Sequence, residues 1–140
     1  MSVPGVEPSM LEDLAAASRI LVDQGVFDQA GHTSMRHPGR AERFLMSRSL
    51  APASTTAADI MEFDLEGAPI DAKGRAAYLE RFIHGEIFKA RSDVNAVVHS
   101  HSPTVVPFTV TRAKLRPLLH NAGFLGLGAP LFEIRKCAGH

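Results

Sequence analysis

The sequence predicts an α/β fold in which helices pack on a mixed, largely antiparallel sheet. Two patterns lead to this prediction. Segments whose apolar residues recur at helical spacing alternate with short apolar segments that are bounded by turn residues. Two of the short segments are also separated only by turn-forming residues, as antiparallel strands are. The length of 140 residues suits one domain, so we predict a single domain over residues 1–140.

Two long helices are expected. The first begins after Pro8, with Ser9 as its N-cap and Glu12 three residues later as in a capping box, and it ends at Gly25. The second covers residues 76–91. Its apolar residues recur on one face: Leu79, Phe82, Ile83, Ile87 and Ala90.

Three strands are expected in the first half of the chain. Residues 26–36 are predicted to be extended, and residues 43–47 (Arg-Phe-Leu-Met-Ser) to form a buried strand. The sequence His-Pro-Gly-Arg-Ala between them is typical of a turn, so the two segments should form a hairpin. A third strand is predicted over residues 60–64, after a short turn that residues 54–56 can cap.

In the second half, the apolar run over residues 94–98 predicts a core strand that continues to His101. A short helix bent by Pro107 is expected over residues 105–110. After a glycine-containing loop, a last strand is predicted over residues 131–134.

The composition excludes several classes of protein. A hydrophobic fraction of 45% and a charged fraction of 21% are typical of a globular protein and not of a disordered one. Lys plus Arg and Asp plus Glu both number 15, so no net charge attracts nucleic acid or an anionic membrane. Cys137 is the single cysteine and cannot form an internal disulfide. The apolar runs are too short to span a membrane and no signal peptide is visible, so we expect a cytoplasmic protein.

His99 and His101 are candidate metal ligands. Residues two apart on a strand face the same side, so the two imidazoles should lie side by side where the strand opens into a loop. Imidazole nitrogens are common ligands of zinc, manganese and similar ions. A His-x-His pair alone is also compatible with structural histidines, but two polar rings at the end of an apolar strand need partners.

Glu80 is a candidate acid or base for catalysis. It lies near the start of the second predicted helix, among apolar residues, and a carboxylate beside a metal site can transfer protons. Its position also suits a surface glutamate that favours a helix N-terminus. Glu86 is a competing carboxylate that we expect to face elsewhere.

Together these segments resemble the class II aldolase/adducin superfamily. The core of the resemblance is Glu80, a helix that ends in Arg91-Ser92-Asp93-Val94, and an apolar strand with His99-Ser100-His101. Upstream, Gly31-His32-Thr33-Ser34-Met35-Arg36 matches the first substrate-binding turn of the family, which usually has Asn in place of His32. The resemblance extends from about Leu11 to Glu133.

The resemblance implies a three-layer α/β/α fold and a homotetramer with active sites near subunit interfaces. It makes His99 and His101 ligands of a divalent metal ion such as zinc or manganese, and Glu80 the acid/base residue. The family's third metal-binding histidine lies farther along, in an Arg-x-His-Gly-like segment that His140 does not match. We therefore expect the C-terminal part of the domain to be missing from this chain. Whether the 140-residue chain is active by itself stays open.

The expected substrate differs from that of the sugar-phosphate aldolases. Those enzymes hold phosphate with a Thr-Gly pair after the second strand and a Ser-Ser pair before the glutamate. This chain has Ser47-Arg48-Ser49 and Tyr78-Leu79 at these places. The loss of small phosphate ligands argues against a sugar phosphate, and Arg48 suggests a planar carboxylate held in a bidentate fork.

Residues 43–52, 78–85 and 118–126 resemble a decarboxylase branch of the superfamily. That branch acts on hydroxylated aromatic or heteroaromatic dicarboxylates, such as dihydroxyphthalate, and on related ring-cleavage acids. The implied reaction is a metal-dependent decarboxylation in which Glu80 protonates the carbon. Two other classes stay open: an aldolase acting on an unphosphorylated hydroxy-keto acid, and a non-catalytic adducin-like binding module.

Five residues are expected to bind the substrate. Arg48 would hold the retained carboxylate, assisted by His32 and Ser49. His120, in a loop of the decarboxylase-like segment, and Arg36, at a strand end, are further candidates. A backbone-bonded loop histidine and a solvated arginine are the alternatives for these last two.

Overall fold

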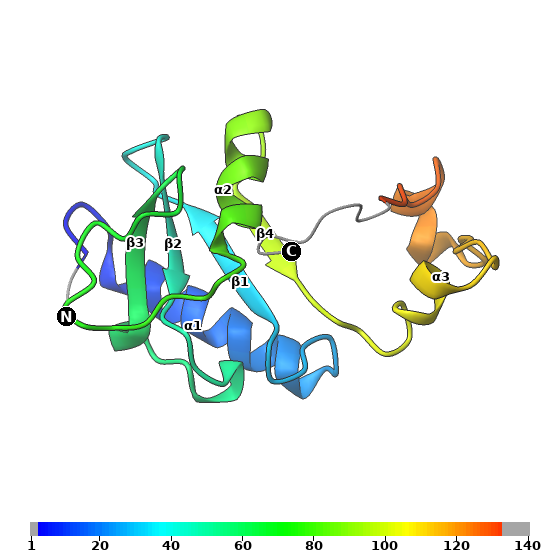
Figure 1. Cartoon of the computed structure of the whole chain (residues 1–140), viewed down its shortest axis with the longest axis horizontal. Helices are drawn as coiled ribbons and strands as arrows, with labels where there is room; N and C mark the ends of the chain where they lie inside the picture. Colours follow the sequence, from blue (N-terminus) through cyan, green and yellow to red (C-terminus); the bar gives the residue numbers. More distant parts are fainter. Residues whose placement is uncertain (1–2, 133–140) are drawn as a thin grey trace, which may run out of the picture. The chain divides into compact units, whose positions relative to one another are not determined.

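The computed structural model describes residues 3–132 of the chain (Figure 1). The chain divides into two compact units, residues 1–102 and 103–140. The first unit contains the sheet and the two long helices. The second contains the short helix α3 (Pro107–Val110) and a 3₁₀ turn (His120–Leu125). In the described part of the chain, no helix is both long enough and apolar enough to cross a membrane.

A four-stranded sheet forms the centre of the first unit. Its strands are β1 (His32–Arg36), β2 (Arg43–Ser47), β3 (Ile60–Asp64) and β4 (Ala96–His99), in the order β3-β2-β1-β4. All three pairings are antiparallel, which confirms the predicted largely antiparallel sheet. The strands β2 and β3 have the predicted bounds, and the β1–β2 pairing confirms the predicted hairpin.

The two faces of the sheet are covered by different helices, α1 (Pro8–Asp23) and α2 (Arg81–Ala90) (Figure 1). Successive residues of a strand face opposite sides. Accordingly, Phe44 of β2 packs with Phe88 of α2, whereas its neighbour Leu45 packs with Leu14 of α1. The first unit therefore has the predicted three layers, α/β/α, with one hydrophobic cluster on each side of the sheet.

Helix α2 begins later than the sequence predicted, at Arg81 instead of residue 76. The residues before it are bound to the loop after β2. The carbonyl of Ala76 accepts a hydrogen bond from the Ser49 N–H, and the Tyr78 hydroxyl donates to the Leu50 carbonyl. These contacts hold this stretch outside the helix and make Glu80 the N-cap residue.

Helix α2 also lies unusually close to the loop that follows β3. A Cβ atom added at Gly85 would lie 2.2 Å from the carbonyl oxygen of Leu65, so only glycine fits there. This close approach fixes the depth at which the neighbouring His84 enters the layer between helix and sheet, where it is fully buried.

The ends of α1 agree with the sequence at one end only. Glu7, not Ser9, is the N-cap, and Pro8 occupies the first helical turn, where its missing N–H costs nothing. The predicted capping by Ser9 is therefore wrong. Gly25 follows the helix with a φ of +67°, and its N–H bonds the Val22 carbonyl, which confirms it as the end of the helix.

Strand β4 lies at the edge of the sheet and ends at His99, two residues before the predicted end. Among residues 3–132 it pairs with β1 alone. Val97 is buried, but Val98 is 50% exposed. The prediction of a core strand is thus wrong for one face of β4, because an apolar run does not show whether both faces are covered.

In the second unit, the predicted helix over residues 105–110 is shortened to Pro107–Val110, because proline fits the first turn of a helix better than its interior. The predicted strand over residues 131–134 lies partly outside the described residues. The two residues of it that the structure describes, Leu131 and Phe132, have no regular secondary structure.

Candidate active site

The centre of the candidate site is a pair of stacked histidines on neighbouring strands. The antiparallel register of β1 and β4 places His32 directly opposite His99. Their rings are nearly parallel, at 15°, and their centroids are 4.7 Å apart. His32 is completely buried, whereas the His99 side chain is 20% exposed. The pair therefore joins the interior of the first unit to its surface.

Glu80 reaches both rings from the start of α2. Its Oε2 atom lies 3.5 Å from Nε2 of His32 and 3.4 Å from Nε2 of His99. The Glu80 side chain is 47% exposed, so it contacts both the buried histidine and solvent. A carboxyl group in this position can exchange a proton with a molecule bound over His99.

His101 lies beyond the end of β4 but still beside His99. The two Nε2 atoms are 3.1 Å apart, so the predicted pairing of these rings is present. On its other side, Nδ1 of His101 bonds Oδ2 of Asp28 at 3.2 Å. An ionised carboxylate only accepts hydrogen bonds, so in the neutral ring the proton is on Nδ1 and the lone pair of Nε2 faces His99.

Asp28 is itself fixed by the backbone. Its carboxylate accepts hydrogen bonds from the N–H groups of Ala30 and Gly31. The hydrogen bond from Ala30, together with that from His101, holds the pKa of Asp28 below its usual value. The carboxylate is therefore ionised at neutral pH and can orient His101.

These residues fit a divalent metal ion. The donor atoms of His32, Glu80 and His99 all lie within 4.8 Å of one another. Two nitrogen ligands of a tetrahedral zinc ion, each about 2.1 Å from it, are about 3.4 Å apart, close to the separation of the His99 and His101 Nε2 atoms. Nε2 of His32 lies behind these atoms and is buried without a hydrogen-bond partner in the described structure. Imidazole and carboxylate donors in this arrangement suit zinc or manganese.

Behind His32 lies a buried hydrogen-bonded chain. Nδ1 of His32 is 2.7 Å from Nε2 of His84, and Nδ1 of His84 is 2.6 Å from Oγ of Ser34. Burial lowers the pKa of His84 to about 3, so this ring is neutral at neutral pH. Burial, and then the neighbouring His99, also lower the pKa of His32.

Tyr78 connects this cluster to the loop after β2. Its ring centroid lies 4.7 Å from that of His32, and its hydroxyl is bonded to the backbone of Leu50. Two predicted substrate-binding residues belong to this loop. Arg48 donates from Nε to Oδ1 of Asp59 at 2.6 Å, and Ser49 is exposed.

Arg36, another predicted substrate-binding residue, is not brought to the histidines. Arg36 ends β1, about 13 Å along the strand from His32. Its guanidinium donates to four backbone carbonyls and stacks on Phe88, which gives it a structural role. His120 begins the 3₁₀ turn of the second unit, and its role at the site stays a prediction.

The site also contains residues that were not among the predicted site residues: Asp28, Ser34, Tyr78 and His84. Asp28 precedes Gly31 by three residues, a spacing at which an aspartate can accept backbone N–H groups. Ser34 is two residues from His32 on a strand, so both face α2. The sequence contains these spacings, but it does not show the partners of Asp28 and Ser34, which come from distant segments.

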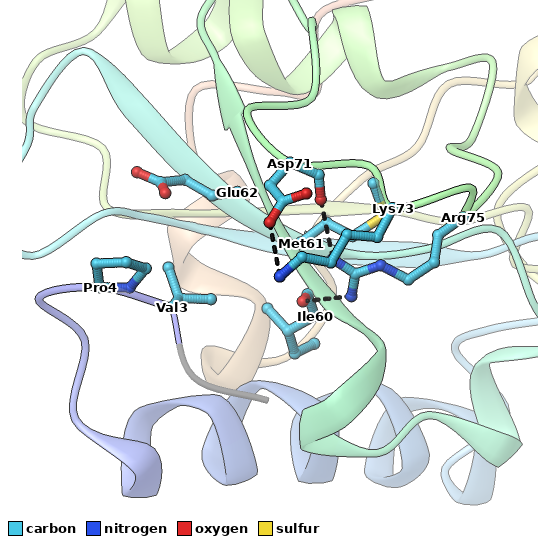
Figure 2. Close-up of a pocket in the computed structure, with 8 residues that line it drawn as sticks. All are labelled: Val3, Pro4, Ile60, Met61, Glu62, Asp71, Lys73 and Arg75. Carbon is cyan, nitrogen blue, oxygen red and sulfur yellow. Dashed lines mark hydrogen bonds and ion pairs between the residues drawn. The ribbon is translucent and has the colours of Figure 1, made fainter.

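A cavity of about 270 Å³ shares Asp28 with the site. Its other lining residues are mostly apolar: Val22, Phe27, Gln29, Ala51, Pro52 and Ala53. A smaller cavity of about 50 Å³ lies beside β3 (Figure 2). Its charged groups are already paired, Lys73 with Asp71 and Arg75 with the Ile60 carbonyl, so it is a weaker candidate.

Comparison with known proteins identifies the family of this fold. The family model "Class II Aldolase and Adducin N-terminal domain" matches residues 12–136. The chain therefore belongs to the class II aldolase and adducin family.

Its relatives include decarboxylases. Decarboxylase tropJ from Talaromyces stipitatus is 40% identical over 138 residues, which is 97% of this chain and 51% of the relative. The 3,4-dihydroxyphthalate decarboxylase of Arthrobacter keyseri is 36% identical over 118 residues, 77% of this chain and 46% of the relative. The chain thus spans about half the length of these relatives.

Solved structures show the same fold. An aldolase II superfamily protein from Pseudomonas syringae has a TM-score of 0.69 and is 30% identical to this chain. The match covers 79% of this chain and 45% of that protein. The predicted α/β/α aldolase-type fold is thereby confirmed.

Proposed function

We propose that this chain provides the metal-binding and proton-transfer residues of a carboxy-lyase. Its substrate would be a hydroxylated aromatic or heteroaromatic dicarboxylate, or a related ring-cleavage acid. The observation that supports this most directly is the convergence of Glu80, His99 and His101 at one end of β4. The similarity to two decarboxylases supports decarboxylation over other reactions of the family.

In this proposal Nε2 of His99 and Nε2 of His101 hold the metal ion, and Asp28 orients His101. Bound by these residues, a divalent ion would supply Lewis-acid stabilisation of negative charge on a substrate oxygen. The retained carboxylate is held by Arg48, assisted by Ser49. Within the described residues, Arg48 uses only Nε for a hydrogen bond, so its two terminal nitrogens are available for the substrate.

Glu80 performs the proton transfer. When the bond between the ring carbon and the departing carboxylate breaks, its electron pair remains on the substrate and carbon dioxide leaves. Glu80, in its acid form, then donates its proton to that carbon. Because the side chain lies beside His99 and is half exposed, it can regain a proton from solvent after each turnover.

The aromatic part of the substrate needs an apolar surface next to the histidines. The 270 Å³ cavity that shares Asp28 with the site is suited to this, because its walls are Phe27, Val22 and the small residues 51–53. We place the ring or its apolar substituents there.

Both units are proposed to belong to one domain, since the family match runs through residues 12–136 without a break at residue 102. The family resemblance also suggests a homotetramer, which light scattering of the purified chain would test.

The activity is tested by product analysis. The purified chain, loaded with zinc or manganese, is incubated with 3,4-dihydroxyphthalate, a hydroxypyridine dicarboxylate and an unphosphorylated hydroxy-keto acid. Release of carbon dioxide from a dicarboxylate supports the proposal. Carbonyl products without carbon dioxide would instead identify an aldolase. Absence of both metal binding and turnover of these compounds would indicate a non-catalytic binding module.

A further inference from the structure

We propose that Ser34 and His84 act as positioning residues that hold His32 in the tautomer with its proton on Nε2. His32 then presents a hydrogen-bond donor to the site, where a metal ligand would present a lone pair. The tautomer follows from the buried contacts alone, whereas its use toward a substrate rests on the proposed function.

The geometry leaves the three side chains little freedom. His32 and Ser34 are two residues apart on β1 and face the same layer, into which α2 inserts His84. Ser34 and His84 are fully buried, and His32 is 1% exposed. With separations of 2.6 and 2.7 Å, each contact is a hydrogen bond that needs one proton between its two atoms.

Ser34 sets the direction in which protons are donated along the hydrogen bonds from Ser34 through His84 to His32. Among residues 3–132, the one hydrogen-bond partner of its hydroxyl is Nδ1 of His84. A buried hydroxyl proton without an acceptor is unfavourable, so Ser34 should donate to Nδ1. In a neutral ring the His84 proton is then on Nε2 and is donated to Nδ1 of His32. The remaining proton of His32 is therefore on Nε2.

The surroundings of Nε2 favour the same tautomer. This atom faces Oε2 of Glu80 at 3.5 Å and has no other hydrogen-bond partner in the described structure. An N–H directed at a carboxylate is attractive, whereas a nitrogen lone pair in the same place would be repelled by it. Ser34 at one end of these hydrogen bonds and Glu80 at the other thus favour the same tautomer of His32, with its proton on Nε2. The lowered pKa values of His32 and His84 agree with neutral rings.

Two consequences follow. First, His32 can donate to Glu80, or to an anionic oxygen of a carboxylate substrate that binds between the two. Second, His32 does not serve as a metal ligand in this state, although its Nε2 lies within 4.8 Å of the ligand atoms of Glu80 and His99. Binding a metal through His32 would require every proton in the chain to move to the opposite side of its hydrogen bond.

Nitrogen-15 NMR of the imidazole rings in the 140-residue chain tests this directly. We expect protonated-type Nε2 and unprotonated-type Nδ1 signals for both His32 and His84. Titration with Zn²⁺, a diamagnetic probe, should change the signals of His99 and His101 while the Nε2 proton of His32 remains. A proton on Nδ1 of His32, or loss of the Nε2 proton when Zn²⁺ binds, would overturn the proposal. Neither result depends on decarboxylase activity.

A variant separates positioning from simple packing. Ser34→Ala removes the hydroxyl that sets the direction, so His32 should shift from one tautomer toward a mixture of two. Thr33→Val is the matched control, because it removes a similarly buried hydroxyl on the same strand that bonds the Val97 carbonyl. A pure Nε2–H tautomer in folded Ser34→Ala would contradict the role of Ser34. If that variant does not fold, the spectrum of the unmodified chain still decides the tautomer.

Discussion

His32 and His99 are cross-strand partners whose rings stack with centroids 4.7 Å apart. This relationship places a fully buried imidazole directly behind a partly exposed one, with Glu80 contacting both. The exposed ring and its neighbour His101 are suited to bind a metal ion. The buried ring is hydrogen-bonded to His84, which is hydrogen-bonded to Ser34, and it is suited to present a hydrogen-bond donor, its Nε2–H, to the site.

Replacement of Glu80 should separate metal binding from chemistry. Glu80→Gln keeps the size of the side chain but cannot donate a carboxylic proton. We expect turnover to fall by about 10²- to 10⁴-fold, as for loss of a general acid, while His99 and His101 still bind metal. Steady-state kinetics and metal analysis of the same sample measure both effects.

The control is Glu86→Gln, which removes a carboxylate of the same helix that pairs with Lys89 at the surface. It should leave turnover unchanged, because exposed ion pairs contribute little. Normal turnover in Glu80→Gln would show that another group supplies the proton.

Asp28 is expected to affect metal affinity without contacting the metal. Asp28→Asn removes the carboxylate that orients His101, and loss of such a partner typically weakens metal binding by about 10- to 100-fold. Calorimetric titration with Zn²⁺ measures this change. Asp13→Asn, on the exposed face of α1, is the control and should bind Zn²⁺ as the unmodified chain does. Equal affinities in the two variants would exclude an orienting role for Asp28.

His84 should make the fold sensitive to acid. Its pKa is lowered to about 3 in the folded chain, from an ordinary value of 6.5. As the pH falls below 6.5, the unfolded chain binds a proton that the folded chain does not, so the free energy of unfolding decreases. The decrease is at most about 1.4 kcal/mol per pH unit and continues until the pH reaches the folded-state pKa.

Urea unfolding between pH 7 and pH 4 can isolate this contribution. His84→Gln cannot titrate, so its free energy of unfolding should decline less steeply than that of the unmodified chain. Parallel curves for the two proteins would mean that His84 is not held neutral by burial.

Arg48 is expected to determine affinity for a dicarboxylate. Arg48→Lys keeps the charge but loses the planar fork, so KM should rise by about tenfold with a smaller change in kcat. Arg91→Lys, which changes an exposed ion pair with Asp93, serves as the control for the same type of substitution. An unchanged KM in Arg48→Lys would place the retained carboxylate elsewhere.

Local sequence patterns were sufficient for some elements and not for others. The strands β2 and β3 were predicted with their bounds, because their apolar residues lie between clear turn signals. The start of α2 was not, because Ala76 and Tyr78 are bound to the distant loop at residues 49–50. The helical spacing of apolar residues gives no information about such a tertiary contact.

The candidate site shows the same division. His99, His101 and Glu80 could be named from their spacing and family resemblance, and the structure brings them together. The position of His32 behind His99 depends on the register of two strands that are far apart in the sequence. The hydrogen bond from His101 to Asp28 also depends on tertiary structure. Such pairings cannot be read from a single sequence.

The most direct test of the central claim measures carbon dioxide release from 3,4-dihydroxyphthalate before metal removal, after removal by a chelator, and after metal is restored. We predict that release stops when the metal is removed and returns when zinc or manganese is added back, with His99→Ala inactive throughout. Release that continues in the metal-free chain, or in His99→Ala, would contradict a metal-dependent decarboxylase site at His99, His101 and Glu80.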